Sequence, residues 1–313
     1  MSAGGEASFR QLRVVVPFLL VVLIWGSTWI VIKDQLGTVP PTWSVAYRFA
    51  NAGAAMFVFA AASGATLRIG WKGHVLAATF GVPQFFFNFN FVYSAELYVT
   101  SGLVAVVFAL LMVPNSALAW LFLKHKATPR FVLGSAIACI GVGMLFVQEV
   151  QASPISPAAA MTGIGLALLG VLSASTANVM QASARLKARP VASLLAWGMT
   201  YGVIANAAFA FARFGPPVVE SRPGYWIGLL YLGVVASAAA FTLYFGLVRA
   251  IGPAKAAYTS LVIPIIAMAI STVAEGYRWS LLAAAGGAVA LAGMAIALSA
   301  GRTAAPPADP PTG

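Results

Sequence analysis

Charged residues are scarce in this 313-residue sequence: 8% of its positions are Asp, Glu, Lys or Arg, and 61% are hydrophobic. Soluble domains carry about 25% charged residues, so the composition excludes an ordinary soluble fold. An apolar stretch of about 20 helical residues crosses a hydrocarbon core of about 30 Å. Ten uncharged intervals reach at least 18 residues: 14–32, 49–67, 73–95, 97–123, 131–148, 150–184, 190–212, 223–248, 256–274 and 279–301. Each predicts one membrane-spanning helix, and the sixth helix is expected from about Ala158 because loop residues precede it.

Cysteine, histidine and acidic residues are also few. The single cysteine, Cys139, excludes an internal disulfide, and its apolar neighbours predict a packing role. The seven acidic residues are dispersed at the ends of the uncharged intervals, and no histidine lies near Cys139 in the sequence. A membrane enzyme needs grouped acids, histidines or a nucleophile beside a base. The sequence therefore argues against an enzyme and predicts neither a metal site nor a cofactor.

The basic residues produce a net charge of +11, but they sort by loop instead of forming one patch. With the N-terminus in the cytoplasm, the inner segments hold thirteen of them: Arg10, Arg13, Arg68, Lys72, Lys124, Lys126, Arg130, Arg185, Lys187, Arg189, Arg249, Lys255 and Arg302. The outer segments hold four, Lys33, Arg213, Arg222 and Arg278. This asymmetry predicts cytoplasmic N- and C-termini. It indicates contact with anionic lipid and not with nucleic acid.

A shift of 150 positions places Pro114 on Pro264 and Gly143 on Gly293, which indicates an internal repeat. Five helices per half is an odd number, so the second half must enter the membrane upside down. We therefore predict an all-α integral membrane protein with ten transmembrane helices in two inverted five-helix repeats. The expected divisions are a cytoplasmic tail 1–12, a first repeat 13–149, an outer linker 150–157, a second repeat 158–301 and a disordered cytoplasmic tail 302–313. Small residues along the fifth and tenth helices predict a packing scaffold.

Arg48 is the basic residue that falls within a predicted span, about 10 Å along the second helix. A guanidinium at that depth costs a few kcal/mol unless it is paired or wetted, so the position indicates function. Three interpretations stay open: contact with a ligand carboxylate, a structural clamp on helix ends or loop carbonyls, and snorkelling outward.

The third helix, around residues 80–93, mixes aromatic rings with amides. Helical spacing places Gln84, Asn88 and Phe91 on one face, after Pro83 has loosened the backbone. Amides at lipid depth are costly unless they face protein or a wet cavity, and rings beside amides suit a ligand that is partly apolar. The alternative is amide hydrogen bonding between helices, with the phenylalanines facing lipid.

Other candidates for substrate binding come from the remaining helices. Trp25 and Thr28 share a face of the first helix, where the alternative is an interfacial anchor. The sixth helix aligns Ser175, Asn178 and Gln181 in one polar stripe. The further candidates are the tyrosines Tyr201, Tyr244 and Tyr258, whose alternative is a structural hydroxyl bond.

With these features in place, the chain resembles the EamA-type, ten-helix branch of the drug/metabolite transporter superfamily. The resemblance covers about residues 10–300 and depends on Trp25-Gly26-Ser27, Pro41 through Arg48-Phe49, Pro114 and Pro264, Glu275, and the glycine-rich fifth and tenth helices. In one departure, His125 stands where the family often has an acidic residue. The family implies a bacterial inner-membrane carrier that exports small metabolites, commonly amino acids, through a central cavity. Within it, this sequence looks most like an aromatic amino acid exporter.

We expect the fourth and ninth helices to bend at Pro114 and Pro264 and to act as gates during transport. The alternative is that both prolines form static kinks. Proton-coupled carriers usually keep a carboxylate or histidine in mid-membrane. His74 and His125 both lie at inner ends, which favours facilitated diffusion or exchange. One chain of ten helices is expected to form a complete pathway in the bilayer as a monomer.

Several other functions stay open. The first is an exporter of other metabolites or drugs. A nucleotide-sugar or phosphate-ester antiporter of the same superfamily needs several buried basic residues, whereas only Arg48 is available. The last is a membrane channel or sensor, which lacks the alternating access of an inverted repeat.

Overall fold

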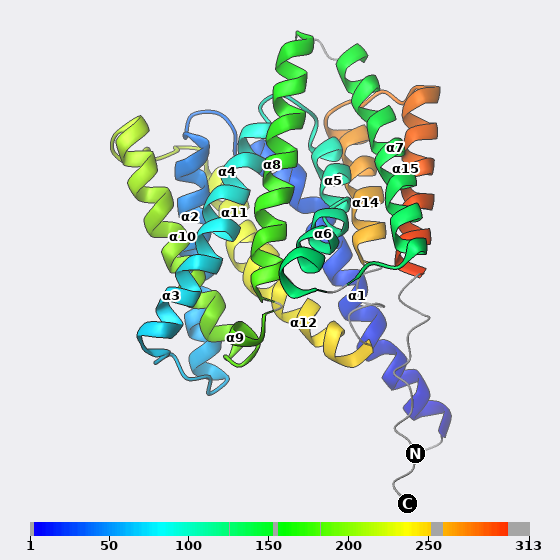
Figure 1. Ribbon diagram of the computed structural model, residues 1–313. Helices are drawn as coiled ribbons and strands as arrows, with labels where there is room; N and C mark the ends of the chain where they lie inside the picture. Colours follow the sequence, from blue (N-terminus) through cyan, green and yellow to red (C-terminus); the bar gives the residue numbers. More distant parts are fainter. Residues whose placement is uncertain (1–2, 125, 153–155, 182, 252–258, 300–313) are drawn as a thin grey trace, which may run out of the picture.

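The computed structural model describes residues 3–124, 126–152, 156–181, 183–251 and 259–299, and these residues contain helices and no strand (Figure 1). Nine of the described helical segments are long and apolar enough to cross a membrane, and Thr259–Ala274 forms a shorter apolar helix. The all-helical, multi-span fold expected from the sequence is thus confirmed. Tyr258, His125 and the tail 302–313 lie outside the described residues.

The first half consists of α1 (Ala3–Asp34), α2 (Pro41–Ala62), a composite third span, a broken fourth span and α7 (Pro129–Ala152). The third span joins α3 (Gly70–Gly81), the π-helix η1 (Val82–Phe87) and α4 (Asn88–Ala95). The fourth span joins α5 (Ser101–Ala109) and α6 (Met112–Leu123). Helix α1 begins at Ala3, so it extends through most of the segment 1–12 that was expected as a tail.

The second half consists of α8 (Pro157–Gln181), the short α9 (Ala184–Lys187), α10 (Val191–Phe214), a composite eighth span, α14 (Thr259–Ala274) and α15 (Leu281–Ser299). The eighth span joins α11 (Pro223–Leu230), the π-helix η2 (Tyr231–Ala239) and α12 (Ala240–Ile251). Proline opens α2, α7, α8 and α11, where its missing N–H costs nothing. Gly215 and Gly276 follow α10 and α14 with positive φ values of 83° and 67°, which glycine adopts without the steric cost of a Cβ.

The two π-helices occupy equivalent places in the two halves. The 150-residue shift that aligns the prolines carries residues 82–87 onto 232–237, inside η2. In η1, Pro83 lacks the N–H that an α-helix needs, so the hydrogen-bond ladder widens there. Side chains satisfy carbonyls in both segments: Asn206 Nδ2 donates to Phe85 O at 2.9 Å, and Ser237 Oγ donates to Leu232 O at 2.8 Å.

Helices α7 and α15 form the tightest pair in the bundle, through the small residues noted in the sequence. A Cβ placed on Gly141 would lie 2.2 Å from the backbone N of Ala290, and one on Gly293 would lie 2.3 Å from that of Ala138. The backbones therefore touch. Helix α2 likewise packs on α10, and α5 on α14. Each pair joins a span to its counterpart about 150 residues later, as expected for a chain built from two repeats. The opposite orientation of the two repeats in the membrane stays a prediction.

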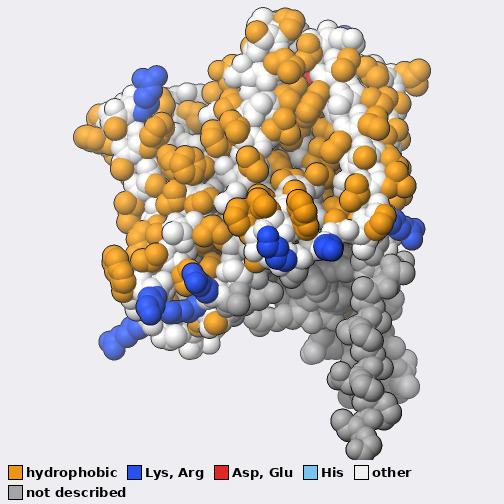
Figure 2. Space-filling model, viewed as in Figure 1, with side chains coloured by type: hydrophobic (Ala, Val, Ile, Leu, Met, Phe, Trp, Pro, Cys, Tyr) orange, Lys and Arg blue, Asp and Glu red, His pale blue; other side chains and the backbone are white. Residues whose placement is uncertain are grey.

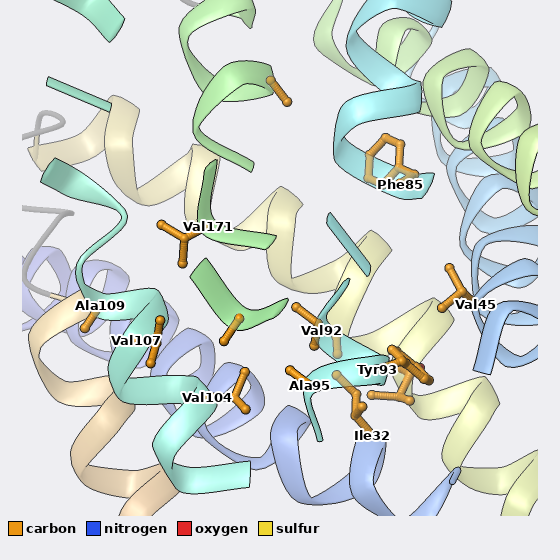
Figure 3. Close-up of a cluster of buried hydrophobic side chains, with 14 of the residues drawn as sticks. Ile32, Val45, Phe85, Val92, Tyr93, Ala95, Val104, Val107, Ala109 and Val171 are labelled. Carbon is orange, nitrogen blue, oxygen red and sulfur yellow. The ribbon is translucent and has the colours of Figure 1, made fainter. Parts of the chain in front are cut away.

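The outside of the bundle is apolar and its two ends differ in charge. Hydrophobic side chains cover most of the face in Figure 2, with Lys and Arg mainly along its lower edge. We call that end, which carries Arg68, Lys72, Lys124, Lys126, Arg130, Arg185 and Arg189, the basic end. The opposite end carries Asp34, Glu96, Glu149, Glu220 and Glu275 together with Lys33, Arg213, Arg222 and Arg278, and we call it the acidic end because the described acidic residues gather there. Inside, one buried cluster joins residues such as Val92 and Tyr93 of α4 to Val104 and Val107 of α5 (Figure 3).

Candidate functional site

A cavity of about 280 Å³ lies among α1, α2, the third span, α5, α8, the eighth span and α14. It brings together eight of the residues selected from the sequence: Trp25, Thr28, Arg48, Gln84, Asn88, Asn178, Tyr244 and Pro264. No described residue of α7, α10 or α15 lines it, which fits a scaffold role for these helices. Three larger hollows lie elsewhere on the bundle and are lined mostly by apolar side chains.

Arg48 extends from α2 into this cavity and is 2% exposed. Its Nη2 donates a long hydrogen bond of 3.4 Å to Ser237 Oγ, and its guanidinium lies 4.5 Å from the centre of the Phe89 ring. Nε and Nη1 have no hydrogen-bond partner. Among the described residues no acidic side chain forms an ion pair with it. The burial argues against outward snorkelling, and two of the guanidinium nitrogens are left without a partner.

Gln84 and Asn88 contribute acceptors to the same cavity. Gln84 Oε1 and Asn88 Oδ1 are buried and have no hydrogen-bond partner. A buried polar atom left unpaired costs about 1–3 kcal/mol, so these atoms are suited to a ligand that pairs with them. The cavity thus combines a fixed positive charge with two amide oxygens.

Asn90, two residues further on, has a different role. Its Nδ2 donates to Asn206 Oδ1 at 2.6 Å and to Phe86 O at 2.8 Å, while its Oδ1 accepts from Thr42 at 2.6 Å. Interhelical amide bonding, the alternative considered for this helix, therefore describes Asn90. It joins α4 to α2 and α10.

Aromatic side chains form the apolar wall. Trp25 donates from Nε1 to Ala236 O at 3.1 Å, and its ring lies 5.5 Å from Phe241 and 5.2 Å from Tyr244. Trp29 lies 5.1 Å from Phe108, and both line the cavity. A flat apolar group therefore meets rings on two sides of the cavity.

The structure also adds residues that sequence reasoning did not select: Trp29, Phe89, Phe108, Ser237 and Ser260. Phe89 could have been selected from the sequence, because it lies about one helical turn after Phe85 in the same aromatic-rich helix. Ser237 had a similar signal, because it shares a face of the eighth span with Phe241 and Tyr244.

Other selected residues lie outside the cavity. Phe91 stacks on Phe87 at 6.3 Å, and Tyr201 Oη lies 3.0 Å from His74 Nδ1 near the basic end. Ser175 is buried with an unpartnered hydroxyl next to the lining residue Ala174, and Gln181 lies at the end of α8. Tyr258 is not among the described residues.

At the acidic end, side-chain contacts join helices that are distant in sequence. Lys33 Nζ donates to the backbone carbonyls of Glu96 and Val99, joining α1 to the end of the third span. The Glu275 carboxylate accepts from the backbone N and the hydroxyl of Ser101, joining α14 to α5. Helix α6 leads toward the basic end, and none of its twelve residues is buried.

The two candidate gating prolines differ. Helix α5 ends at Ala109, and α6 begins at Met112. Pro114 explains this break, because it cannot donate to the carbonyl of Leu110 and its ring crowds that group. Pro264 lies within α14, which continues past it, and lines the cavity.

A bundle of apolar spans around a mainly apolar cavity that contains a few buried polar side chains is typical of a multi-pass membrane transporter. The chain belongs to the EamA-like transporter family, whose sequence profile matches residues 12–147 and 161–299. The match occurs once in each half of the chain. The protein is therefore a transporter of the drug/metabolite transporter superfamily and not an enzyme.

Relatives agree with this assignment. The chain is 26% identical over 274 residues to protein PagO of Salmonella typhimurium, covering 87% of this chain and 88% of PagO. It is 25% identical over 288 residues to a probable amino-acid metabolite efflux pump of the same organism, covering 89% and 92%. A solved crystal structure with 20% identity matches 90% of this chain and 95% of its own, with a TM-score of 0.66, which supports the fold alone.

Proposed function

We propose that the protein exports amino acids and similar small amphiphilic metabolites, with aromatic amino acids as the first substrates to test. One observation carries this proposal: Arg48, Gln84 and Asn88 line one cavity, and each has a buried polar side-chain atom without a hydrogen-bond partner. The family and the name of one relative, a probable amino-acid metabolite efflux pump, support a metabolite exporter.

The chemistry of the cavity suits a zwitterion. A guanidinium binds a carboxylate through charge-assisted hydrogen bonds, and amide oxygens accept from an ammonium group. The rings of Trp25, Trp29 and Phe108 then offer stacking contacts to an aromatic side chain. The volume of about 280 Å³ is just below the roughly 300–1,000 Å³ of drug-sized pockets, so it suits a single small metabolite.

Transport is proposed to occur by alternating access, with this structure representing a state closed at the acidic end. Bending at the break before Pro114 and at Pro264 would let the fourth and ninth spans open and close the two ends; static kinks are the alternative. We place the protein in the bacterial inner membrane with both termini and the basic end in the cytoplasm. One cavity within one chain favours a functional monomer.

A phosphate-ester antiporter is less well supported, because Arg48 is the one basic side chain among the described residues that line the cavity. Phosphates usually need more than one such group. A channel or sensor would show no saturable counterflow of substrate. A counterflow measurement in liposomes therefore separates it from a carrier.

Transport of a substrate panel by purified protein in liposomes tests the proposal. The panel should include phenylalanine, tryptophan, alanine, a nucleotide sugar and a hydrophobic drug. Arg48→Gln should raise the half-saturation concentration about ten- to hundredfold, because a hydrogen bond to a charged group contributes about 1.5–3 kcal/mol. Gln84→Ala and Asn88→Ala should each raise it about two- to tenfold.

Arg68→Gln is the matched control, since Arg68 is an exposed arginine at the basic end. It should transport at the wild-type rate. If all three cavity variants also kept wild-type kinetics, the cavity would not be the substrate site.

A further inference from the structure

Glu96 is the first residue after the third span, and its side chain is 0% exposed. Both carboxylate oxygens are buried without a hydrogen-bond partner. An acidic residue at a helix end normally lies in water, where its charge is cheap. Here the charge would be buried, and an unpaired buried carboxylate costs several kcal/mol or more.

The nearest cation does not neutralise this carboxylate by direct contact. Lys33 Nζ is bonded to the backbone carbonyls of Glu96 and Val99. Among the described residues the one ion pair within 4.0 Å is Arg222 with Asp34, so neither Lys33 nor Arg48 forms an ion pair with Glu96. The hydroxyl of Tyr93, on the same helical turn, is buried and lies close to the Arg48 guanidinium.

Two other carboxylates face this region, and both have donors. Glu275, after α14, accepts from the backbone N of Ser101 at 3.1 and 3.2 Å and from Ser271 Oγ at 2.6 Å. Glu149 of α7 accepts from the backbone N of Thr100 at 3.2 Å. Both lie at the N-terminus of α5, whose dipole and free N–H groups favour anions.

Glu96 therefore lacks the hydrogen-bond donors that Glu149 and Glu275 have. Burial raises the pKa of Glu96 well above its usual range; the Lys33 and Arg48 cations lower it, and the Glu275 carboxylate raises it further. Among the described residues, no three His, Cys, Asp or Glu side chains are grouped so that they could hold a metal ion.

We propose that Glu96 is a proton-binding site: it holds a proton while the acidic end is closed and releases it when that end opens to water. The contacts of Lys33 with Glu96 and Val99, and of Ser101 with Glu275, are the ones that must separate for opening. Opening would hydrate the carboxylate and remove the reason for its protonation. Closure of the acidic end thus takes up one proton at Glu96. Glu96 lies at the end of a span and not in its middle, so this coupling of protonation to closure needs no acidic residue at mid-membrane.

The direction of the pH effect follows from this difference. The closed end has the higher pKa for Glu96, so low pH favours closure. As the pH rises from the ordinary glutamate pKa of about 4.3 toward the raised value, the open end gains charge while the closed end stays neutral. The closed end therefore loses stability relative to the open end across this interval.

Infrared spectroscopy of the purified full-length protein at a series of pH values tests the protonation without any substrate. The wild-type protein should show a buried carboxylic-acid C=O band that disappears with a pKa above that of ordinary glutamate. In a Glu149→Gln background, which removes the other buried carboxyl group of this region, Glu96→Gln should abolish the band and Glu96→Asp should shift its frequency, while Glu220→Gln, which removes a half-buried carboxylate at the same end, should leave it unchanged. A band that persists in Glu96→Gln, or its absence in the wild type, overturns the proposal.

Cysteine alkylation tests the link to opening. In a Cys139→Ala background, Val104→Cys places a thiol on a residue that is 0% exposed and does not line the cavity. Its labelling by a water-soluble maleimide should speed up as the pH rises beyond the change expected for a free thiol, and Glu96→Gln should remove that excess while Glu220→Gln keeps it. An equal excess with and without Glu96 overturns the link. Neither measurement uses a transported substrate, so failure here is separate from failure of the proposed amino acid export.

Discussion

The guanidinium of Arg48 lies 4.5 Å from the centre of the Phe89 ring, and both side chains line the same cavity. The ring holds the cation in place without neutralising it, because a quadrupole attracts charge but accepts no hydrogen bond. Arg48 can therefore be buried and still keep Nε and Nη1 free.

Phe89→Leu should weaken substrate binding while leaving the bundle folded. A cation–π contact contributes about 0.5–2 kcal/mol, so the half-saturation concentration should rise about two- to thirtyfold. Liposome transport kinetics measure the effect. Phe87→Leu is the control, since Phe87 is 45% exposed and lies outside the cavity. Equal kinetics for the two variants would contradict the role given to Phe89.

Gly141→Ala should destabilise the contact between α7 and α15. The added Cβ would lie 2.2 Å from the backbone N of Ala290, and a backbone atom cannot move aside as a flexible side chain can. Overpacking of this kind costs about 1–3 kcal/mol. The melting temperature in detergent should fall, whereas Gly143→Ala, with nothing within 4 Å of its Cβ, should leave it unchanged.

Asn206→Leu should destabilise the third span. It removes the donor to Phe85 O within η1 and the acceptor for Asn90 Nδ2, leaving buried groups unpaired at about 1–3 kcal/mol each. Thermal unfolding of the detergent-solubilised protein measures the loss. Asn51→Leu is the comparison, because Asn51 Nδ2 donates to Tyr47 O of its own helix, and this variant should lose less. A smaller loss for Asn206→Leu would show that the amide pair is not a structural link.

Pro114→Ala should lower transport more than protein abundance. The alanine N–H can bond the carbonyl of Leu110, so the break between α5 and α6 should close and the fourth span should stiffen. Transport rates and protein amounts in the same liposomes measure the effect. Pro129→Ala, at the first residue of α7, should be silent. Unchanged transport by Pro114→Ala would favour a static kink.

The spans were predictable because their signals are local. Uncharged intervals, opening prolines and closing glycines lie within each helix, and the depth of Arg48 follows from counting residues after Pro41. The face assignment in the third span was less successful beyond Asn88. A constant helical spacing places Phe91 beside Gln84 and Asn88, but the wider turn of η1 shifts the phase, and Phe89 lines the cavity instead.

The burial of Glu96 had no local signal. Its sequence position, just after a span, is where acidic residues usually meet water. Segments distant in the sequence surround it: α2 and α8 pack on α4, and Lys33 of α1 donates to the Glu96 carbonyl across 63 residues. Contacts at that separation depend on the assembled bundle, so neither the closure of the acidic end nor the environment of this carboxylate follows from the chain read in order.

The two π-helices at equivalent places in the halves each hold a residue in excess of a regular helix. Returning one such turn to α geometry would rotate the rest of that span by about 100° and move it by about 1.5 Å along its axis. Gln84 lies within the first of these segments, and the Arg48 partner Ser237 lies within the second. A change of helical winding would thus turn Gln84 away from the cavity in one half, or Ser237 away from Arg48 in the other, without breaking the span.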